Sequence, residues 1–217
     1  MKIPYPVLIK RTEDTPKWLP IITSVGAVLL AFIISGIILA ATGANPFKIY
    51  SYLYKASFGS WGAFSDVIVK ATPLLLIGLG CSLAFRMRLW NIGAEGQFFV
   101  GAFMASAVVM VPLVNLETTP SWAIISLMAV LGMVGGAVYA FIPGILKAKL
   151  NINEIITTLM LNYIAVLWNN YWIFGNWSEA GFQMTKTFPK AAWLPRLADY
   201  ANQVPAFSGM TLHVGIL

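Results

Sequence analysis

The sequence LPIITSVGAVLLAFIISGIILAAT at residues 19–42 decides the fold, because it runs without a single charged side chain. A helix needs about 20 mostly apolar residues to cross the hydrocarbon layer of a bilayer. The apolar run exceeds the roughly 7–15 residues of a signal-peptide core, and its leader contains Glu13 and Asp14. We therefore interpret it as a retained membrane-spanning helix.

The composition of the whole chain agrees with that interpretation. Of its 217 residues, 59% are hydrophobic and 10% are charged, whereas a soluble domain carries about 25% charged residues. A soluble fold of this size could not hide so much apolar surface, because its own surface needs polar cover. Lipid removes that requirement, so composition selects the membrane class.

Further apolar stretches follow, at about residues 67–85, 97–116, 121–146 and 155–174, and a sixth begins near Leu212. We therefore expect an all-α, polytopic transmembrane helix bundle of about five or six helices. The expected organisation is a cytoplasmic N-terminal segment at 1–18 and a transmembrane domain at 19–217. That domain is expected to be incomplete at its C-terminus and to carry an extracytoplasmic loop at about 175–211.

Lysines and arginines near the spans set the orientation of a membrane protein. With the N-terminus in the cytoplasm, the inner stretches hold Lys2, Lys10, Arg11, Lys17, Arg86, Arg88, Lys147 and Lys149. The outer stretches hold fewer basic residues, namely Lys48, Lys55, Lys186, Lys190 and Arg196. The net charge of +6 does not indicate nucleic-acid binding, because the basic residues are scattered between apolar runs.

The chain offers little for catalysis or for a cofactor. The single cysteine, Cys81, excludes an intrachain disulfide, and the single histidine, His213, has no companion for a metal site. No P-loop sequence occurs, so we expect no ATP binding through that motif. No nucleophile is paired with a base. We therefore expect a protein that is not an enzyme and that carries neither cofactor nor metal.

The segment NIGAEGQ, at residues 91–97, places an acid and two amides among small residues. Irregular backbone at membrane depth is tolerated only where protein buries it or where it lines a wet cavity. Transporters place such segments beside their binding sites. One hypothesis is that Glu95 faces the translocation path, with Asn91 and Gln97 offering hydrogen bonds. The alternative is an ordinary cytoplasmic turn.

A polar stripe marks the fifth apolar stretch. Its members fall within about 80° on a helical wheel and are Glu154, Thr158, Asn162 and Asn169. Polar residues inside a membrane usually face a bundle interior or a wet pathway, and Trp168 and Trp172 beside them would suit a flat solute. The alternative is that the amides bond helices together and that the tryptophans anchor the helix at the interface.

Two other features are structural in our interpretation. Small residues recur every fourth position at Gly132, Gly136, Ala140 and Gly144, a ridge that lets another helix approach closely. The segment 175–211 is interrupted by prolines, and its Trp177 and Trp193 suit a belt at the headgroup level. That segment is either a docking surface for an external partner or a connecting loop on the membrane.

Several motifs in this order resemble a known family. They are ATPLLLIGLG at 71–80, LAFR at 83–86, NIGAEGQ at 91–97 and NEIITTLMLNYIA at 153–165. Over roughly residues 50–170 the chain resembles the permease subunits of the nucleoside and simple-sugar branch of bacterial ABC importers. Such permeases are longer than this chain, so we expect a fragment or a truncated product.

The resemblance implies a transport function in the bacterial cytoplasmic membrane. It implies a second permease subunit, a cytoplasmic ABC ATPase that hydrolyses ATP, and an extracytoplasmic substrate-binding protein or lipoprotein as partners. The solute would be a nucleoside or a simple sugar. An ion-coupled secondary transporter is the alternative, because broken helices and a membrane glutamate fit that class too. A structural scaffold is disfavoured by the cost of placing Glu95 in lipid.

Overall fold

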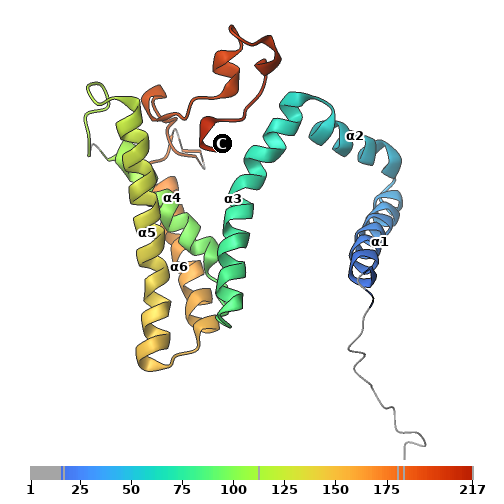
Figure 1. Ribbon diagram of the computed structural model, residues 1–217, viewed down its shortest axis with the longest axis horizontal. Helices are drawn as coiled ribbons and strands as arrows, with labels where there is room; N and C mark the ends of the chain where they lie inside the picture. The colour runs from blue at the N-terminus through green and yellow to red at the C-terminus, as the bar shows by residue number, and fades with distance from the viewer. Residues whose placement is uncertain (1–15, 17, 112, 180, 183, 217) are drawn as a thin grey trace, which may run out of the picture. The chain divides into compact units, whose positions relative to one another are not determined.

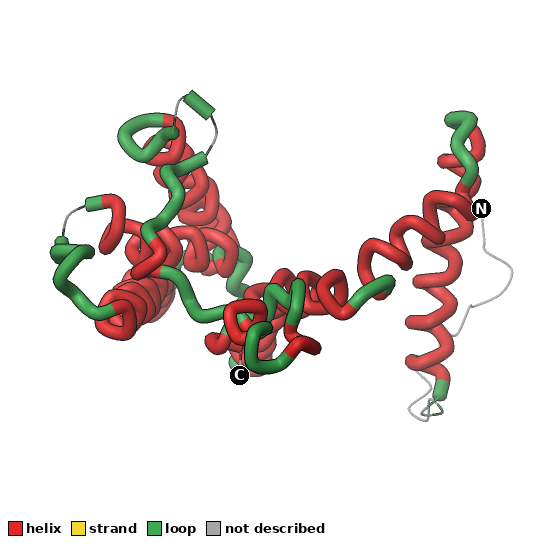
Figure 2. Tube along the Cα trace, turned by 90° about the horizontal axis from the view of Figure 1, so that it is seen from above, coloured by secondary structure: helices red, strands yellow, loops and turns green. Residues whose placement is uncertain are grey.

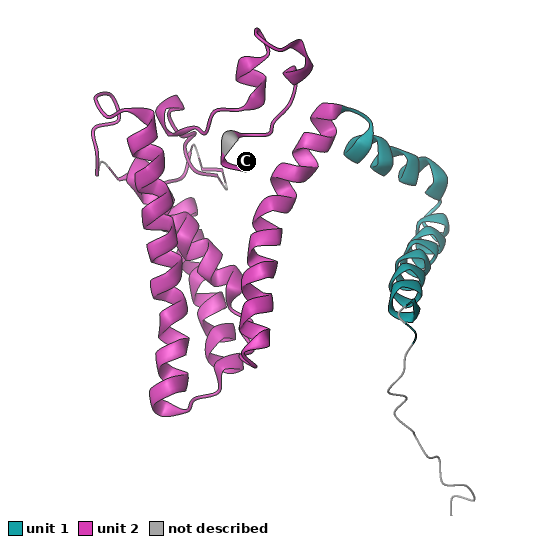
Figure 3. Ribbon diagram, viewed as in Figure 1, with its two compact units in different colours: residues 1–60 teal, residues 61–217 magenta. Residues whose placement is uncertain are grey.

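The computed structural model describes residue 16 and residues 18–111, 113–179, 181–182 and 184–216 (Figure 1). Nearly all of the predicted cytoplasmic segment 1–18, with its basic residues, lies outside the described residues. The described chain is all-α, as expected, and Figure 2 draws no strand in it. Its extended pairings are two isolated bridges, Ser178 with Thr185 and Arg196 with His213. Two compact units divide the chain at residues 60 and 61 (Figure 3).

The first unit contains two helices, α1 (Leu19–Ala41) and α2 (Pro46–Phe58). Helix α1 ends at Ala41, Thr42 is its C-cap, and Gly43 follows with a φ of +81°. The Asn45 side chain then caps α2 by accepting a hydrogen bond from the Lys48 amide, and Pro46 occupies the first helical turn. The connection between the first two apolar stretches therefore contains a helix of 13 residues.

The second unit is built from α3 (Trp61–Arg86), α4 (Ala94–Met110), α5 (Ser121–Leu150) and α6 (Glu154–Phe174). Helix α4 packs against both α5 and α6, which form a hairpin (Figure 1). The Lys147 and Leu146 carbonyls accept hydrogen bonds from the chain after α5, where Asn151 adopts a left-handed conformation with φ 51°. Asn153 caps α6 by accepting a hydrogen bond from Ile155 N–H.

The segment after α6 is irregular, as predicted. Its described part holds four short 3₁₀ turns: η1 (Lys190–Ala192), η2 (Leu197–Tyr200), η3 (Pro205–Phe207) and η4 (Val214–Ile216). Near Leu212, where a sixth apolar stretch was expected to begin, the described residues form the turn η4.

Three helices of the described chain, α1, α3 and α5, are long and apolar enough to cross a membrane. The six α-helices of the described chain confirm the expected bundle of about five or six helices, and three of them meet both criteria. Helix α4 has 17 residues, or about 25 Å at 1.5 Å per residue, which is shorter than a hydrocarbon core of about 30 Å. Helix α6 has 21 residues, but its polar stripe keeps it out of the apolar class.

Small residues allow α4 and α5 to cross closely. A Cβ placed on Gly101 of α4 would lie 2.9 Å from the carbonyl oxygen of Gly132, and one on Gly132 would lie 3.2 Å from that of Gly101. Gly136 faces the Gln97 carbonyl at 3.2 Å in the same way. The far end of the predicted ridge differs, because nothing lies within 4 Å of a Cβ at Gly144.

Candidate functional site

The turn between α3 and α4 is closed by a pair of amides. Asn91 Nδ2 donates to Gln97 Oε1 at 3.1 Å, and Gln97 Nε2 donates back to Asn91 Oδ1 at 3.2 Å. The same Asn91 oxygen accepts the Gly93 N–H at 3.1 Å. These bonds satisfy a backbone donor at the start of α4, where a helix has no partners of its own. Asn91 and Gln97, two of the predicted site residues, are therefore joined directly.

This turn is held against α6 by Thr158. The Ile92 N–H donates to Thr158 Oγ1 at 3.2 Å, and that hydroxyl donates to the Glu154 carbonyl oxygen at 2.7 Å. The Thr158 residue is only 4% exposed. A Cβ on Gly93 would lie 2.6 Å from the Thr158 carbonyl oxygen, closer than packed atoms allow. Glycine is needed here for room, since its φ of −90° is ordinary.

Glu95 and Asn162 form a separate pair between α4 and α6. Asn162 Nδ2 donates to Glu95 Oε2 at 3.2 Å, and the Glu95 side chain is exposed. Asn162 Oδ1 is buried without a hydrogen-bond partner. Because Glu95 and Gln97 are two positions apart on a helix, they point to different sides of α4. The predicted site residues therefore divide into two groups.

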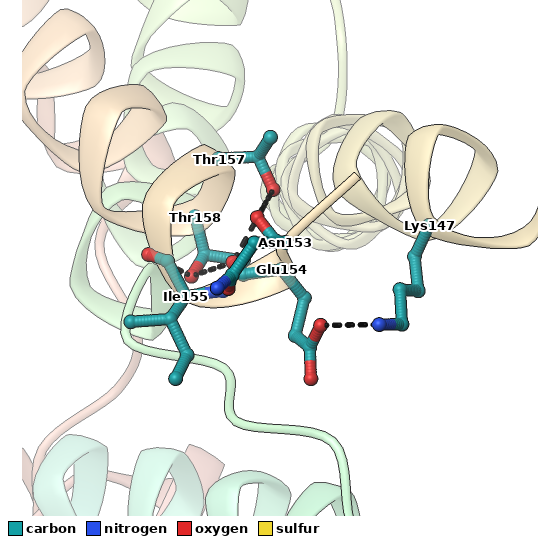
Figure 4. A network of polar contacts seen from close by, with 6 residues as sticks. All are labelled: Lys147, Asn153, Glu154, Ile155, Thr157 and Thr158. Atoms are coloured by element: carbon teal, nitrogen blue, oxygen red, sulfur yellow. Dashed lines mark hydrogen bonds and ion pairs between the residues drawn. The ribbon is translucent and has the colours of Figure 1, made fainter. Parts of the chain in front are cut away.

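An ion pair joins the ends of α5 and α6. Lys147 Nζ lies 2.9 Å from Glu154 Oε2, with the two side chains 37% and 18% exposed. Figure 4 shows this pair beside the first turn of α6, where Thr157 Oγ1 donates to the Asn153 carbonyl oxygen. Glu154 precedes the apolar part of α6. The hydrogen bond from Lys147 lowers the pKa of the Glu154 carboxyl, with a smaller contribution from that residue's own backbone.

A pocket of about 310 Å³ collects one of the two groups of predicted residues. Its lining includes four of them, Asn91, Gln97, Glu154 and Thr158. Ala140 and Gly144, which we had assigned to helix packing, also line it, and this explains the open space at Gly144. The remaining lining residues are Ala84, Leu89, Trp90, Pro143, Lys147 and Ala148. Glu95 and Asn162 do not take part.

Sequence reasoning missed Trp90, Pro143 and Lys147 as pocket residues. Trp90 directly precedes the NIGAEGQ segment, so its proximity was a usable signal. Lys147 had been considered only for orientation, because its pairing with Glu154 depends on the α5–α6 turn. Pro143 is buried inside α5, and nothing in the sequence around it indicates a pocket.

The C-terminal member of the polar stripe, Asn169, packs α6 against α4. Asn169 is 7% exposed and donates to the Phe99 carbonyl oxygen at 3.0 Å, which is the interhelical bonding that we weighed as the alternative. Trp177 is 5% exposed and stacks on Phe103 with ring centroids 4.8 Å apart. Trp177 therefore packs against α4, and its place at the headgroup level stays a prediction. Trp193 is 42% exposed.

The two groups together offer amide, hydroxyl, carboxylate and ammonium groups next to apolar and aromatic surface. Such a set can donate and accept hydrogen bonds to a polar solute while an exposed indole contacts a flat ring. In the described part of the chain, no three His, Cys, Asp or Glu side chains come together as metal ligands would.

Comparison with known proteins relates the chain to permease components of transport systems. Residues 63–203 match the family described as the branched-chain amino acid transport system permease component. The chain is 35% identical over 210 residues to the glucose ABC transporter permease protein TsgB13 of Haloferax volcanii, which covers 94% of this chain and 53% of that protein.

Two further relatives come from bacteria. Identity to the guanosine ABC transporter permease protein NupP of Bacillus subtilis is 31% over 195 residues, or 88% of this chain and 52% of that protein. Identity to the nucleoside ABC transporter permease protein NupB of Lactococcus lactis is 34% over 147 residues, which cover 68% of this chain and 39% of that protein. The chain spans about half the length, or less, of these relatives. No solved structure shows a significant match to it.

Proposed function

The chain belongs to the family of branched-chain amino acid transport system permease components, and on that premise we propose that it forms part of the membrane-spanning subunit of an ABC importer. Its solute would be a nucleoside or a related small polar molecule such as a simple sugar. The names of its relatives support this range, since they refer to glucose, to nucleosides and to guanosine. The proposed location is the bacterial cytoplasmic membrane, with the N-terminus in the cytoplasm.

The proposal includes the partners that such an importer needs. A second permease subunit would complete the translocation path, and a cytoplasmic ABC ATPase would hydrolyse ATP on a separate chain. An extracytoplasmic substrate-binding protein would deliver the solute. The family match supports this set over the ion-coupled alternative, because the relatives are named as parts of ABC transporters.

The observation that carries the proposal for this site is the exposed Glu95–Asn162 pair. The pair joins α4 to α6 beside exposed apolar surface, since neighbouring Phe98 is 46% exposed. Glu95 is the second residue of α4, and a carboxylate that faces lipid at membrane depth is costly unless it meets water or a partner. A water-filled route beside α4 and α6 removes that cost, so we place Glu95 and Asn162 on the path.

The pocket at the α5–α6 turn would form one mouth of that path. The Asn91–Gln97 pair uses one N–H of each amide, so the second N–H of each can still donate to a passing hydroxyl or ring nitrogen. Trp90 is 58% exposed and lines the same space. Thr158 and Glu154 complete a lining that matches a solute with one flat face and several polar edges.

Uptake by the complete transporter tests the proposal. The intact protein would be reconstituted in vesicles with its second permease, ATPase and binding protein, and supplied with labelled guanosine, uridine, ribose or glucose. We expect nucleoside uptake that requires ATP and survives an ionophore. Uptake that does not depend on ATP and is abolished by the ionophore would favour the ion-coupled alternative. Uptake of sugars alone would overturn the nucleoside assignment.

A further inference from the structure

Helix α2 carries two lysines on one face. Lys48 and Lys55 are seven positions apart, which places them within about 20° of each other around the helix. With Ser51, Tyr52 and Ala56 they line a surface hollow of about 550 Å³. Helix α2 contains no acidic residue, so nothing within it neutralises this positive face.

The opposite face of α2 is covered by α1. Tyr50 donates its hydroxyl to the Phe32 carbonyl oxygen at 2.6 Å, and its ring meets the Phe32 ring edge-on at 5.5 Å. A Cβ on Gly36 would lie 3.2 Å from the Tyr50 hydroxyl oxygen. Tyr50 points about 150° away from the two lysines. The lysine face is therefore directed away from α1.

The length of α2 restricts where it can lie in a membrane. Helices α1 and α3 are each long and apolar enough to cross, so the connection between them leaves and re-enters the bilayer on one side. Helix α2 has 13 residues, or about 20 Å, too short to cross the roughly 30 Å hydrocarbon core. It therefore belongs near the surface of the bilayer.

Its aromatic side chains fit that position. Phe47 is 85% exposed, Tyr52 is 72% exposed and Tyr54 is 66% exposed. These rings are large and partly apolar, so an apolar or interfacial environment suits them better than water. Aromatic residues concentrate at the headgroup level of membranes, where one end of the ring is dry and the other wet. Basic residues on such a helix are attracted to anionic lipids.

From these observations we propose that α2 lies in the headgroup layer and that Lys48, Ser51 and Lys55 bind the phosphates of anionic lipids. The two ammonium groups would each supply charge and hydrogen-bond donors, and the Ser51 hydroxyl a further donor between them. This binding site goes beyond the proposed transport function and does not depend on it, since it needs no solute and no ATP.

The test measures lipids retained by the intact protein. The protein is purified in detergent with equal amounts of phosphatidylglycerol and phosphatidylcholine, and bound lipids are counted by native mass spectrometry. We expect K48Q/K55Q to weaken phosphatidylglycerol binding, by about fivefold for each lysine, and to leave phosphatidylcholine unchanged. K186Q/K190Q, which removes the same charge elsewhere, is expected to keep the lipid, as is the charge-preserving K48R/K55R.

Equal loss in K186Q/K190Q would mean a general effect of net charge and would overturn the proposal. Retention of the anionic lipid by K48Q/K55Q would also overturn the proposal. If that variant instead loses the second permease subunit, the lysine face is a protein interface. A salt titration of the unmodified protein gives a test that needs no variant. Lipid binding through exposed lysines must weaken as salt rises, and binding that is indifferent to salt contradicts the proposal.

Discussion

Gly93 and Thr158 are in direct contact across the α4–α6 joint. A Cβ on Gly93 would lie 2.6 Å from the Thr158 carbonyl oxygen and 3.0 Å from the Thr158 Cβ. The neighbouring Ile92 N–H donates to the Thr158 hydroxyl at 3.2 Å. Two motifs that are sixty-five positions apart therefore form one joint, and the pocket lies beside it because Thr158 also lines the pocket.

The first prediction concerns the room at Gly93. Gly93→Ala forces the turn away from α6, because the new methyl group has no space, and overpacking of this kind costs about 1–3 kcal/mol. We expect a lower midpoint of thermal unfolding for the intact protein in detergent. Gly78→Ala is the matched control, since nothing lies within 4 Å of a Cβ there and alanine favours a helix over glycine by about 0.5–1 kcal/mol. Equal midpoints for the two variants would contradict the close contact.

A second prediction distinguishes the hydrogen bond of the Thr158 hydroxyl from the space that the side chain fills. Thr158→Val keeps the shape but leaves the Ile92 N–H without a partner, at a cost of about 1–3 kcal/mol. We expect faster hydrogen exchange at the Ile92 amide. Thr158→Ser retains the hydroxyl and is expected to keep that amide protected. Unchanged exchange in the valine variant would show that the hydrogen bond does not hold the turn.

A third prediction compares two glycines: Gly101 on α4, which contacts the small-residue ridge of α5, and Gly144 at the far end of that ridge. Gly101→Ala brings a methyl group to 2.9 Å from the Gly132 carbonyl oxygen, so we expect a loss of stability of about 1–3 kcal/mol. Gly144→Ala meets open space and should leave unfolding unchanged or slightly improved. Chemical denaturation of both variants in detergent measures the difference. A ridge that packed along its whole length would make both substitutions harmful.

A fourth prediction tests the proposed path. Glu95→Gln removes the charge from the Asn162 contact, and a hydrogen bond to a charged group contributes about 1.5–3 kcal/mol. We expect uptake by the reconstituted transporter to fall about tenfold or more, with ATP hydrolysis retained. Glu117→Gln, at an exposed position outside the site, is the control. If Glu95→Gln and Asn91→Ala both leave uptake unchanged, neither residue lines the route.

A fifth prediction follows from the Lys147–Glu154 ion pair. Lys147 lowers the pKa of Glu154, so the ionised carboxyl stabilises the folded state above its ordinary pKa of about 4.3. That stabilisation is lost as the pH falls through the lowered value in the folded protein. We expect Lys147→Met to lower the unfolding midpoint slightly at neutral pH, and the difference from the unmodified protein to shrink below about pH 4. A difference that grows under acid would contradict the pairing.

The long apolar helices could be predicted from sequence because their signal is local. Helices α1, α3 and α5 need only a long and mostly apolar run, and the run at residues 19–42 gives α1 almost to the residue. Helix α2 was missed because its aromatic and basic composition gives no such run, although Asn45 and Pro46 are ordinary signals for a helix start. Helix α4 ends earlier than predicted, at Met110, since apolar residues continue past the end of the helix.

The chemistry of the candidate site was also predictable, but its grouping was not. Polar residues in apolar sequence identified Asn91, Glu95 and Gln97 as a set. Which of them meets α6 depends on how α4 is rotated against it, and that rotation is fixed by contacts distant in sequence, such as Gly96 against Asn162. Periodicity alone cannot supply those contacts.

The stacked rings of Phe103 and Trp177 give the segment after α6 a mechanical role. Trp177 begins that segment, whereas Phe103 lies midway along α4, and their rings are tilted by only 15°. A force that displaces residues near Trp177 must either drag the middle of α4 with it or break this contact. This contact thus ties the start of the segment to the middle of α4, the helix that carries Glu95 in its first turn.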